Sequence, residues 1–390
     1  MIAISAVGML NALGNDLAEI AANLARGHAP GMKLNHSRLL GQRPCWLGEV
    51  TGALPAVPAA FARHASRNNR LLLGALAQIR RQVDRAIAAY GADRVAVVLG
   101  TSTSGLDESD QLATAYRRGQ TLPGYYYQMQ ELGDPARFIS AYLALNGPSY
   151  TLSTACSSSA RAIISGRRLI ETGMADVAIV GGADSLSRMP INGFDSLESL
   201  SAERCRPFSA ERDGISIGEG AALLLLTKEP GQIVLRGVGE SSDAWHMSAP
   251  HPEGNGAISA IRMALTDAGL NPADIGYINL HGTATRLNDG IEAKVIHQLF
   301  GNRVPCSSTK HLTGHTLGAA GAIEAALAWL CLTQDIPLPP QDFTGGTLDA
   351  DLEDCGLLTA PGRLERRYIM SNSFAFGGNN TCLILGEHNA

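Results

Sequence analysis

The chain has 390 residues, of which 45% are hydrophobic and 17% are charged, and its formal net charge is −5. This length allows more than one domain or two fused halves, and the acidic balance argues against a general nucleic-acid binder. The seven cysteines include no pair with metal-ligand spacing, so we expect free thiols and no bound metal. The N-terminus lacks a signal-peptide pattern and the longest apolar runs are too short to span a bilayer, which predicts a cytoplasmic protein with no membrane span.

Taken in chain order, the predicted elements form two copies of one plan. Each copy has a strand ending in glycine, a helix, a strand entering a Gly-Thr turn, a strand-plus-helix unit, and a strand ending in paired glycines. The first copy comprises residues 1–8, 59–90, 94–101, the unit around Cys156 and 177–182, and the second comprises 232–239, 256–268, 277–283, the unit around His315 and 368–378. This order predicts a duplicated α/β architecture with mainly parallel sheets covered on both faces. We expect halves at 1–230 and 231–390, and a surface excursion at 340–365.

Cys156 is the first candidate functional residue. An extended approach leads into a cluster of small residues, and a helix-like pattern follows and stops at Gly173. A cysteine on such a turn lies at the positive end of a helix, which favours a reactive thiolate. A buried, inert cysteine is the alternative, and this segment alone supports both interpretations equally.

Two histidine-containing segments follow in the second half. His281 comes directly after a predicted strand, at the edge where open α/β sheets bind ligands, although a structural histidine is commoner there. The other segment contains Lys310 and His315 before a Gly- and Ala-rich helix start, with Glu324 on the helix that follows. A solvated surface amine is the alternative interpretation of Lys310.

The last candidate segment is the glycine turn at residues 372–380. Its Gly377-Gly378 pair can free backbone N–H groups to point at an anion. A plain tight turn between two strands is the alternative.

Together, the order and the residues of these segments resemble the motifs of the β-ketoacyl synthases, the elongating condensing enzymes (KAS I/II type) of the thiolase superfamily. The resemblance covers nearly the whole chain, including residues 206–208, 211–214 and 218–220. It implies a thiolase-like fold in which two duplicated βαβαβαββ halves form a five-layer αβαβα sandwich. It also implies decarboxylative condensation of an acyl group with malonyl-acyl carrier protein to give a β-ketoacyl product. The substrates would arrive on the 4′-phosphopantetheine arm of the carrier protein, with no further cofactor.

The resemblance assigns a role to each candidate residue. Cys156 matches the nucleophile, His281 and His315 match the catalytic pair, and Lys310 and Glu324 match a supporting charged pair. The remaining matches are the oxyanion-hole N–H groups of Cys156 and Phe376, the gate Phe376, the pantetheine contacts Thr283 and Thr285, and the glycine-loop residues Gly377, Gly378 and Asn380.

The same resemblance implies partners. The family forms dimers through the first half, so we expect a homodimer or a heterodimer with a related synthase or chain-length factor. Because carrier proteins are acidic, a basic docking patch is also expected. The candidates for it are Arg63, Arg67, Arg70, Arg204, Arg206 and Arg212.

Some residues depart from the family pattern. Arg286 stands where proline is usual, and Asn379 stands where threonine is usual. These changes leave the catalytic residues intact, but they favour a specialised polyene or polyketide pathway as a competitor to housekeeping fatty-acid synthesis.

Two other functions remain open. A coenzyme A-dependent thiolase would need a second cysteine in the glycine loop, whereas Cys382 lies further along in a predicted strand. A chain-length factor would have lost the nucleophile, which is present here. We therefore expect the active member, working alone or with an inactive paralogue.

Overall fold

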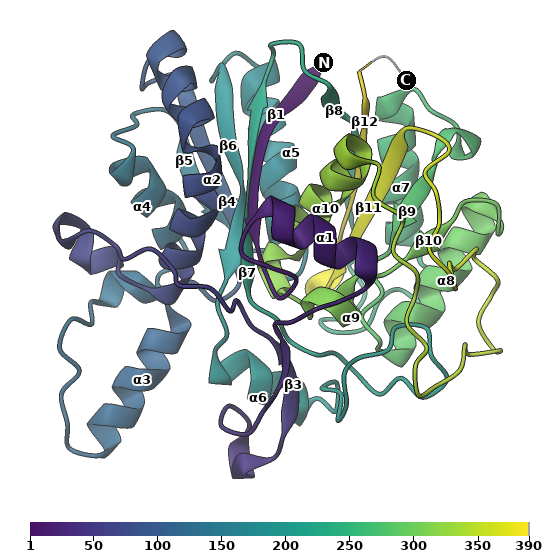
Figure 1. Ribbon diagram of the computed structural model, residues 1–390, viewed down its shortest axis with the longest axis horizontal. Helices are drawn as coiled ribbons and strands as arrows, with labels where there is room; N and C mark the ends of the chain where they lie inside the picture. The colour runs from purple at the N-terminus through teal and green to yellow at the C-terminus, as the bar shows by residue number, and fades with distance from the viewer. Residues whose placement is uncertain (389–390) are drawn as a thin grey trace.

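The computed structural model describes residues 1–388, and within them a ten-stranded sheet runs in the order β10-β9-β11-β12-β8-β1-β7-β6-β4-β5 (Figure 1). Its strands are β1 (Ile2–Leu10), β4 (Val95–Gly100), β5 (Ser149–Leu152), β6 (Val177–Asp184), β7 (Gly220–Thr227), β8 (Ile233–Ser242), β9 (Tyr277–Asn279), β10 (Cys306–Ser307), β11 (Tyr368–Ala375) and β12 (Asn379–Glu387). A separate two-stranded sheet consists of β2 (Met32–Asn35) and β3 (Cys45–Gly48).

The helices alternate with these strands along the chain. They are α1 (Leu17–Arg26), α2 (Arg67–Tyr90), α3 (Leu106–Arg117), α4 (Asp134–Tyr142), α5 (Ser158–Glu171), α6 (Arg188–Ser196), α7 (Asn255–Ala268), α8 (Arg286–Phe300), α9 (Lys310–Thr313) and α10 (Ala320–Gln334). Short 3-10 turns include η1 (Leu40–Gln42), η2 (Ala59–His64), η3 (Tyr127–Gln130), η4 (Pro272–Asp274), η5 (Leu317–Ala319) and η6 (Phe376–Gly378).

The sheet is mixed, so the prediction of mainly parallel sheets is wrong. Strand β4 pairs in parallel with β5 and β6, and β9 pairs in parallel with β10 and β11. The inner neighbours, from β6 through β7, β1, β8 and β12 to β11, pair antiparallel. The turn η6 joins β11 directly to β12, and a connection this short can join only antiparallel neighbours.

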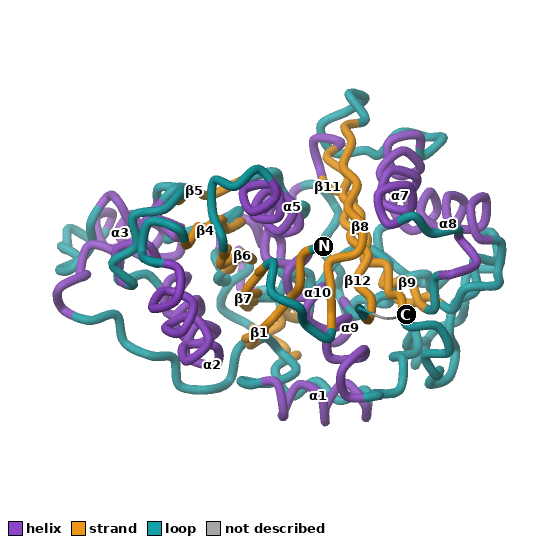
Figure 2. Tube along the Cα trace, turned by 90° about the horizontal axis from the view of Figure 1, so that it is seen from above, coloured by secondary structure: helices purple, strands orange, loops and turns teal. Residues whose placement is uncertain are grey.

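The layered arrangement is confirmed. Helices α2 and α4 pack on the outside of the first half of the sheet, α5 and α10 lie in the middle, and α7 and α8 cover the second half. In Figure 2, α2 and α5 lie on opposite sides of β4, β6 and β7. The buried residues divide accordingly into an outer cluster on each side and a larger central cluster. This is the five-layer α/β sandwich that the resemblance implies.

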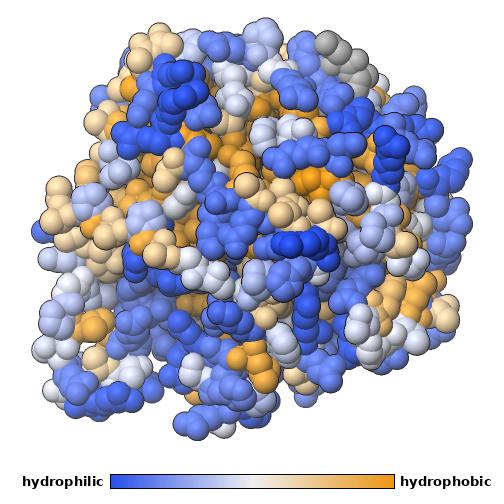
Figure 3. Space-filling model, in the orientation of Figure 1, coloured by the Kyte–Doolittle hydropathy of each residue, from blue (hydrophilic) through white to orange (hydrophobic). Residues whose placement is uncertain are grey.

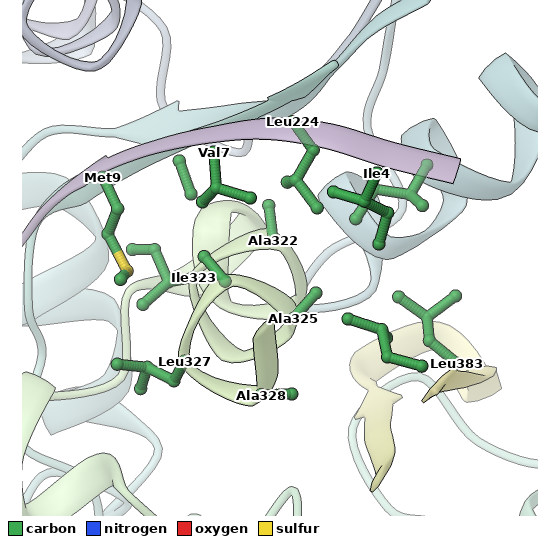
Figure 4. Packing of buried hydrophobic residues seen from close by; sticks show 14 of the residues in the cluster. Ile4, Val7, Met9, Leu224, Ala322, Ile323, Ala325, Leu327, Ala328 and Leu383 are labelled. Atoms are coloured by element: carbon green, nitrogen blue, oxygen red, sulfur yellow. The ribbon is translucent and has the colours of Figure 1, made fainter. Parts of the chain in front are cut away.

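Helix α10 is apolar on all sides because it is enclosed between the two halves of the sheet. Figure 4 shows Ile323 of this helix close to Val7 and Met9 of β1, while Leu383 of β12 lies near its other side. By length and hydropathy the stretch Leu317–Gln334 would pass as a membrane span, but 83% of it is buried inside the protein. We therefore identify it as a central core helix.

The predicted surface excursion at 340–365 is only partly correct. This segment contains no helix or strand, and half of its residues are exposed. However, Gln341, Cys355 and Leu364 are buried. The side chain of Gln341 accepts a hydrogen bond from the backbone N–H of Ser308 at 2.9 Å, so this loop supports the segment that contains Lys310.

Candidate active site

Cys156 lies on a tight turn between β5 and α5, as predicted. Ala155 before it has a left-handed backbone with φ +52°, and α5 begins two residues after it. The hydroxyl of Ser158 donates to the carbonyl of Ala155 at 2.6 Å and accepts from the N–H of Thr154 at 2.9 Å, which holds the turn. A Cβ on Gly100 of β4 would lie only 2.3 Å from the N atom of Ser159, so a glycine is needed for this close approach.

His315 faces Cys156 from the other half of the chain. Its backbone N–H donates to the carbonyl of Ser216 at 2.6 Å, and its carbonyl accepts the N–H of Gly218 at 2.9 Å. Its Nε2 lies 3.1 Å from the Sγ of Cys156, and its Nδ1 accepts the backbone N–H of Leu317 at 3.2 Å. Because Nδ1 is an acceptor, the proton of the neutral ring is on Nε2 and is directed at the sulfur.

His281 follows β9 and lies beside His315, with ring centroids 5.5 Å apart and planes 87° apart. The Nζ of Lys310 is 3.4 Å from the Nδ1 of His281 and donates to its carbonyl oxygen at 2.6 Å. A donor at Nδ1 again leaves the proton on Nε2. Both rings therefore present the same tautomer to the site.

Lys310 and Glu324 form a buried ion pair behind the histidines. The Nζ of Lys310 lies 2.5 Å from the Oε1 of Glu324, and the two residues are only 1% and 2% exposed. The alternative of a solvated surface amine is therefore wrong. A buried charge needs such a partner because desolvation is costly.

Burial controls the titration of the site. It raises the pKa of Cys156 to about 11, although the charge of Lys310 and the backbone N–H groups of Phe376 and Cys156 act in the opposite direction. Burial, followed by the charge of Lys310, holds the pKa of His281 and His315 well below the usual value, so both rings are neutral. The expectation of a thiolate in the resting enzyme is wrong, because desolvation outweighs the electrostatic effect of the helix end.

The glycine turn η6 closes the site from β11. Gly377 and Gly378 have φ of +81° and +75°, and the N–H of Gly377 donates to the carbonyl of Met247 at 2.7 Å. The amide of Asn380 donates to the carbonyl of Gly378 at 3.2 Å and to Asp243 Oδ1 at 2.8 Å. These bonds fix the conformation of the turn, and the N–H of Phe376 is one of those that lower the pKa of Cys156.

A cavity of about 430 Å³ connects these residues. Its lining includes the predicted residues Cys156, His281, His315, Thr283, Thr285, Phe376 and Asn380. The hydroxyls of Thr283 and Thr285 lie 2.9 Å apart, and the ring of Phe376 is 5.5 Å from that of Phe194. Lys310 and Glu324 lie behind the cavity wall, and Gly377 and Gly378 shape the turn rather than line the cavity.

The ligand atoms of Cys156, His281 and His315 lie within 4.8 Å of one another, so their spacing alone would admit a metal ion. The raised pKa of Cys156 and the nearby charge of Lys310 both disfavour a cation there. The donor set fits acyl chemistry better.

The predicted docking arginines mostly make intramolecular contacts. Arg67 pairs with the buried Glu219, Arg70 donates to the carbonyls of Leu54 and Pro55, Arg204 donates to the carbonyl of His311, and Arg206 bonds Glu203 and Gly345. Arg63 is exposed, with its guanidinium 5.8 Å from the ring of Tyr126. Figure 3 shows one face of the molecule, which is largely hydrophilic with hydrophobic residues interspersed.

Arg212, also a predicted docking residue, and Arg286 lie at the cavity instead. The buried Arg212 and the exposed Arg286 both line it, and a guanidinium N–H of Arg212 points to the carbonyl of Arg286 at 3.4 Å. Arg212 also bonds Asp349, so its position is fixed by the protein.

Sequence reasoning missed two acids that organise the His281 loop. Glu292 accepts the backbone N–H groups of His281 and Gly282, each at 2.7 Å, and Asp289 accepts those of Thr283 and Ala284 at 3.0 and 3.2 Å. Burial raises the pKa of Glu292 to about 7. The spacing of three residues on one helix places both acids on the same face and is the signal that was available.

The comparisons with known proteins agree with this geometry. Residues 1–230 match the N-terminal domain of beta-ketoacyl synthases, and residues 233–343 match their C-terminal domain. The 3-oxoacyl-[acyl-carrier-protein] synthase 2 of Synechocystis sp. is 30% identical over 420 residues, covering 99% of this chain and 98% of the relative. Nodulation protein E of Rhizobium meliloti is 31% identical, with 98% of both chains covered.

Solved structures give the same result. A chain from the ketosynthase (ApeO) complex with its chain length factor (ApeC) from Xenorhabdus doucetiae has a TM-score of 0.98 and 63% identity, over 99% of this chain and 98% of that one. The ishigamide ketosynthase/chain length factor matches with a TM-score of 0.88 and 26% identity, over 99% and 98%. This protein therefore belongs to the β-ketoacyl synthase family, the acyltransferases that condense acyl groups into β-ketoacyl products.

Proposed function

We propose that Cys156 accepts the growing acyl chain and that His281 and His315 assist its condensation with a malonyl extender, both substrates being bound to an acyl carrier protein. The observation that best supports these roles is the contact of His315 Nε2 with Cys156 Sγ at 3.1 Å, in a ring whose other nitrogen is already an acceptor. The site therefore has one nucleophile and two neutral imidazole donors.

In the first step, the sulfur of Cys156 attacks the thioester carbonyl of the acyl-carrier protein. The C–S bond to the carrier arm breaks, and the thiol proton of Cys156 passes to the departing thiolate of the arm. The backbone N–H groups of Cys156 and Phe376 stabilise the oxyanion of the tetrahedral intermediate. Because the resting thiol is protonated, its proton leaves during this transfer rather than before it.

In the second step, the carboxylate of the malonyl group leaves as carbon dioxide. The Nε2–H groups of His281 and His315 donate to the thioester oxygen as enolate charge develops on it. The enolate carbon then attacks the acyl group on Cys156, the C–S bond breaks, and the Cys156 thiolate takes a proton from solvent. The pair Lys310–Glu324 keeps His281 in the donor tautomer.

Residues of the cavity wall position the carrier arm. Thr283 and Thr285 contact the pantetheine, Phe376 acts as the gate that admits the extender, and Asn380 with Gly377 and Gly378 holds the oxyanion-hole turn. Arg63, the exposed one among the predicted arginines, remains the docking candidate with the best access to solvent.

The roles are tested by mixing the protein with acyl- and malonyl-carrier protein and following each species by intact-mass spectrometry. We expect Cys156→Ala to prevent both acylation and condensation. We expect His281→Ala and His315→Ala to self-acylate but to fail in condensation. Normal turnover in any of these variants would rule out its assigned role.

Cys382→Ala is the matched control, because Cys382 is fully buried in β12 and packs in the core of the second half. It should retain condensation. A thiolase would instead be supported if the unmodified protein acted on coenzyme A esters and Cys382→Ala lost this activity.

We also propose that the chain is the active subunit of a heterodimer with a chain-length-factor-like paralogue, in a specialised polyene or polyketide pathway of the cytoplasm. The 63% identical relative was solved with its chain length factor, and all seven cysteines of this chain are free and buried, as expected in a reducing compartment. The repeated strand order on either side of β8 and β1 supports duplicated units at residues 1–230 and 231–390. Purification with and without the paralogue, followed by product mass analysis, tests the pairing. Equal activity and product length without it would support a homodimer.

A further inference from the structure

Asp184, the last residue of β6, is a buried carboxylate that does not line the cavity. Its Oδ1 accepts the hydroxyls of Thr101 and Thr103 at 2.6 and 2.8 Å and the N–H groups of Ser102 and Thr103, both at 2.8 Å. Its Oδ2 accepts the N–H of Gly318 at 2.5 Å. The carboxylate therefore joins the loop after β4, in the first half, to the turn that follows His315, in the second half.

The bond to Gly318 fixes a strained turn. Leu317 has a left-handed backbone with φ +51°, which an L-amino acid adopts only when its neighbours hold it there. The N–H of the next residue, Gly318, donates to Asp184. The N–H of Leu317 itself donates to the Nδ1 of His315. A Cβ on Gly318 would lie 2.8 Å from Asp184 Oδ2, so the two groups are in direct contact.

The same loop reaches the turn that holds the nucleophile. The hydroxyl of Ser102 donates to the carbonyl of Ala155 at 3.4 Å, and Ala155 is the left-handed residue before Cys156. The conformations on both sides of the contact between Cys156 and His315 thus depend on one carboxylate.

We infer that Asp184 is a positioning residue that keeps the Leu317 N–H on the Nδ1 of His315 and so maintains the Nε2–H that the condensation step uses. This inference rests on the proposed role of His315. The charge of Asp184 also opposes thiolate formation at Cys156, whereas Lys310 favours it, and the neighbouring His281 and His315 are neutral.

The test is Asp184→Asn, because an amide has one oxygen and one NH₂ group and cannot accept hydrogen bonds on both sides. We expect kcat for condensation to fall by about tenfold or more, with KM for malonyl-carrier protein and the extent of Cys156 acylation changed by less than about twofold. We also expect the pH profile of Cys156 alkylation to move to lower pH, because a negative charge near the sulfur is removed. A purely structural role would not produce this shift.

Asp134→Asn is the matched control. Asp134 is equally buried, accepts from Asn69 at 2.8 Å and contacts His64 Nδ1 at 2.6 Å, and does not line the cavity. It should lose stability without changing kcat or the alkylation profile. If Asp184→Asn does not fold, Thr103→Val removes one hydroxyl donor and should give a smaller loss of kcat in the same direction.

Unchanged kcat in Asp184→Asn, or equal losses in acylation and condensation, would overturn the inference. The single variant His315→Ala separates the inference from the proposed function. If His315→Ala alone condenses normally, the proposed role of His315 fails, and that result is independent of Asp184.

Discussion

At the scale of single residues, desolvation decides the protonation state of the proposed nucleophile, Cys156. Cys156 is 7% exposed and burial raises its pKa to about 11, so the thiol form dominates at pH 7. The histidines on either side are neutral for the same reason. The resting site is therefore uncharged except for the ion pair behind it.

The alkylation rate of Cys156 should reflect this pKa. A raised pKa leaves less thiolate at every pH, so the rate with iodoacetamide should rise about tenfold per pH unit from pH 7 to 9.5 without levelling off. Intact-mass measurement of the singly alkylated protein gives the rate, with Cys156→Ala as the background. A plateau below pH 9 would contradict the pKa of this thiol.

Removing both Lys310 and Glu324 should restore the stability that is lost when Lys310 alone is removed, but it should not restore activity. Lys310→Met leaves Glu324 as an unpaired buried charge, so we expect a loss of about 3–5 kcal/mol in the free energy of unfolding. Lys310→Met combined with Glu324→Met should recover most of that stability but not condensation, because His281 Nδ1 loses its donor. Urea denaturation and the condensation assay measure the two effects. Full activity of the double variant would show that Lys310 has only a structural role.

At the scale of elements, the site depends on how closely β4 approaches the start of α5. A Cβ on Gly100 would lie 2.3 Å from the N atom of Ser159 and 2.4 Å from the carbonyl carbon of Ser158. These are backbone atoms of α5, so they can give way only if the helix start moves. The turn that holds Cys156 would move with it.

Gly100→Ala should therefore lower the free energy of unfolding by about 1–3 kcal/mol and slow the acylation of Cys156. Gly193→Ala in α6 is the control, because a Cβ there meets nothing within 4 Å. In a helix interior this change should be neutral or stabilise by about 0.5–1 kcal/mol. Thermal unfolding and the acylation rate test both variants, and equal behaviour of the two would show that the close approach of β4 has no effect.

At the scale of the whole molecule, the sheet ends in an open edge at β5. The carbonyls of Pro148 and Leu152 accept the N–H groups of Val97 and Thr101, so the alternation of the strand turns the N–H of Thr151 toward the free edge. Such an edge is a ready surface for pairing with another chain, and it lies just before the nucleophile turn.

Thr151→Pro should weaken assembly through this edge. Proline removes the outward N–H but is tolerated in an edge strand, so the monomer should keep its circular dichroism spectrum. Sedimentation velocity should show a shift from dimer to monomer, or loss of the paralogue when the two are purified together. An unchanged assembly would show that the contact is made elsewhere.

The fold class and the candidate residues at the centre of the site could be predicted from the sequence alone. Cys156, His281 and His315 each lie in a short segment whose local conformation is set by neighbouring residues. The turn before α5 and the strand end before His281 could therefore be predicted from the local sequence. The Lys310 and Glu324 pair followed from the resemblance.

Properties that arise between distant segments could not be predicted without the three-dimensional structure. The pKa of Cys156 depends on burial by the second half, and the role of Asp184 depends on Gly318, which lies in the other half of the chain. The engagement of Arg67 with Glu219 and the antiparallel inner strands likewise depend on partners far away in sequence. Desolvation, charge pairing and strand direction are set by the atoms that surround a group, and for these residues most of those atoms come from another part of the chain.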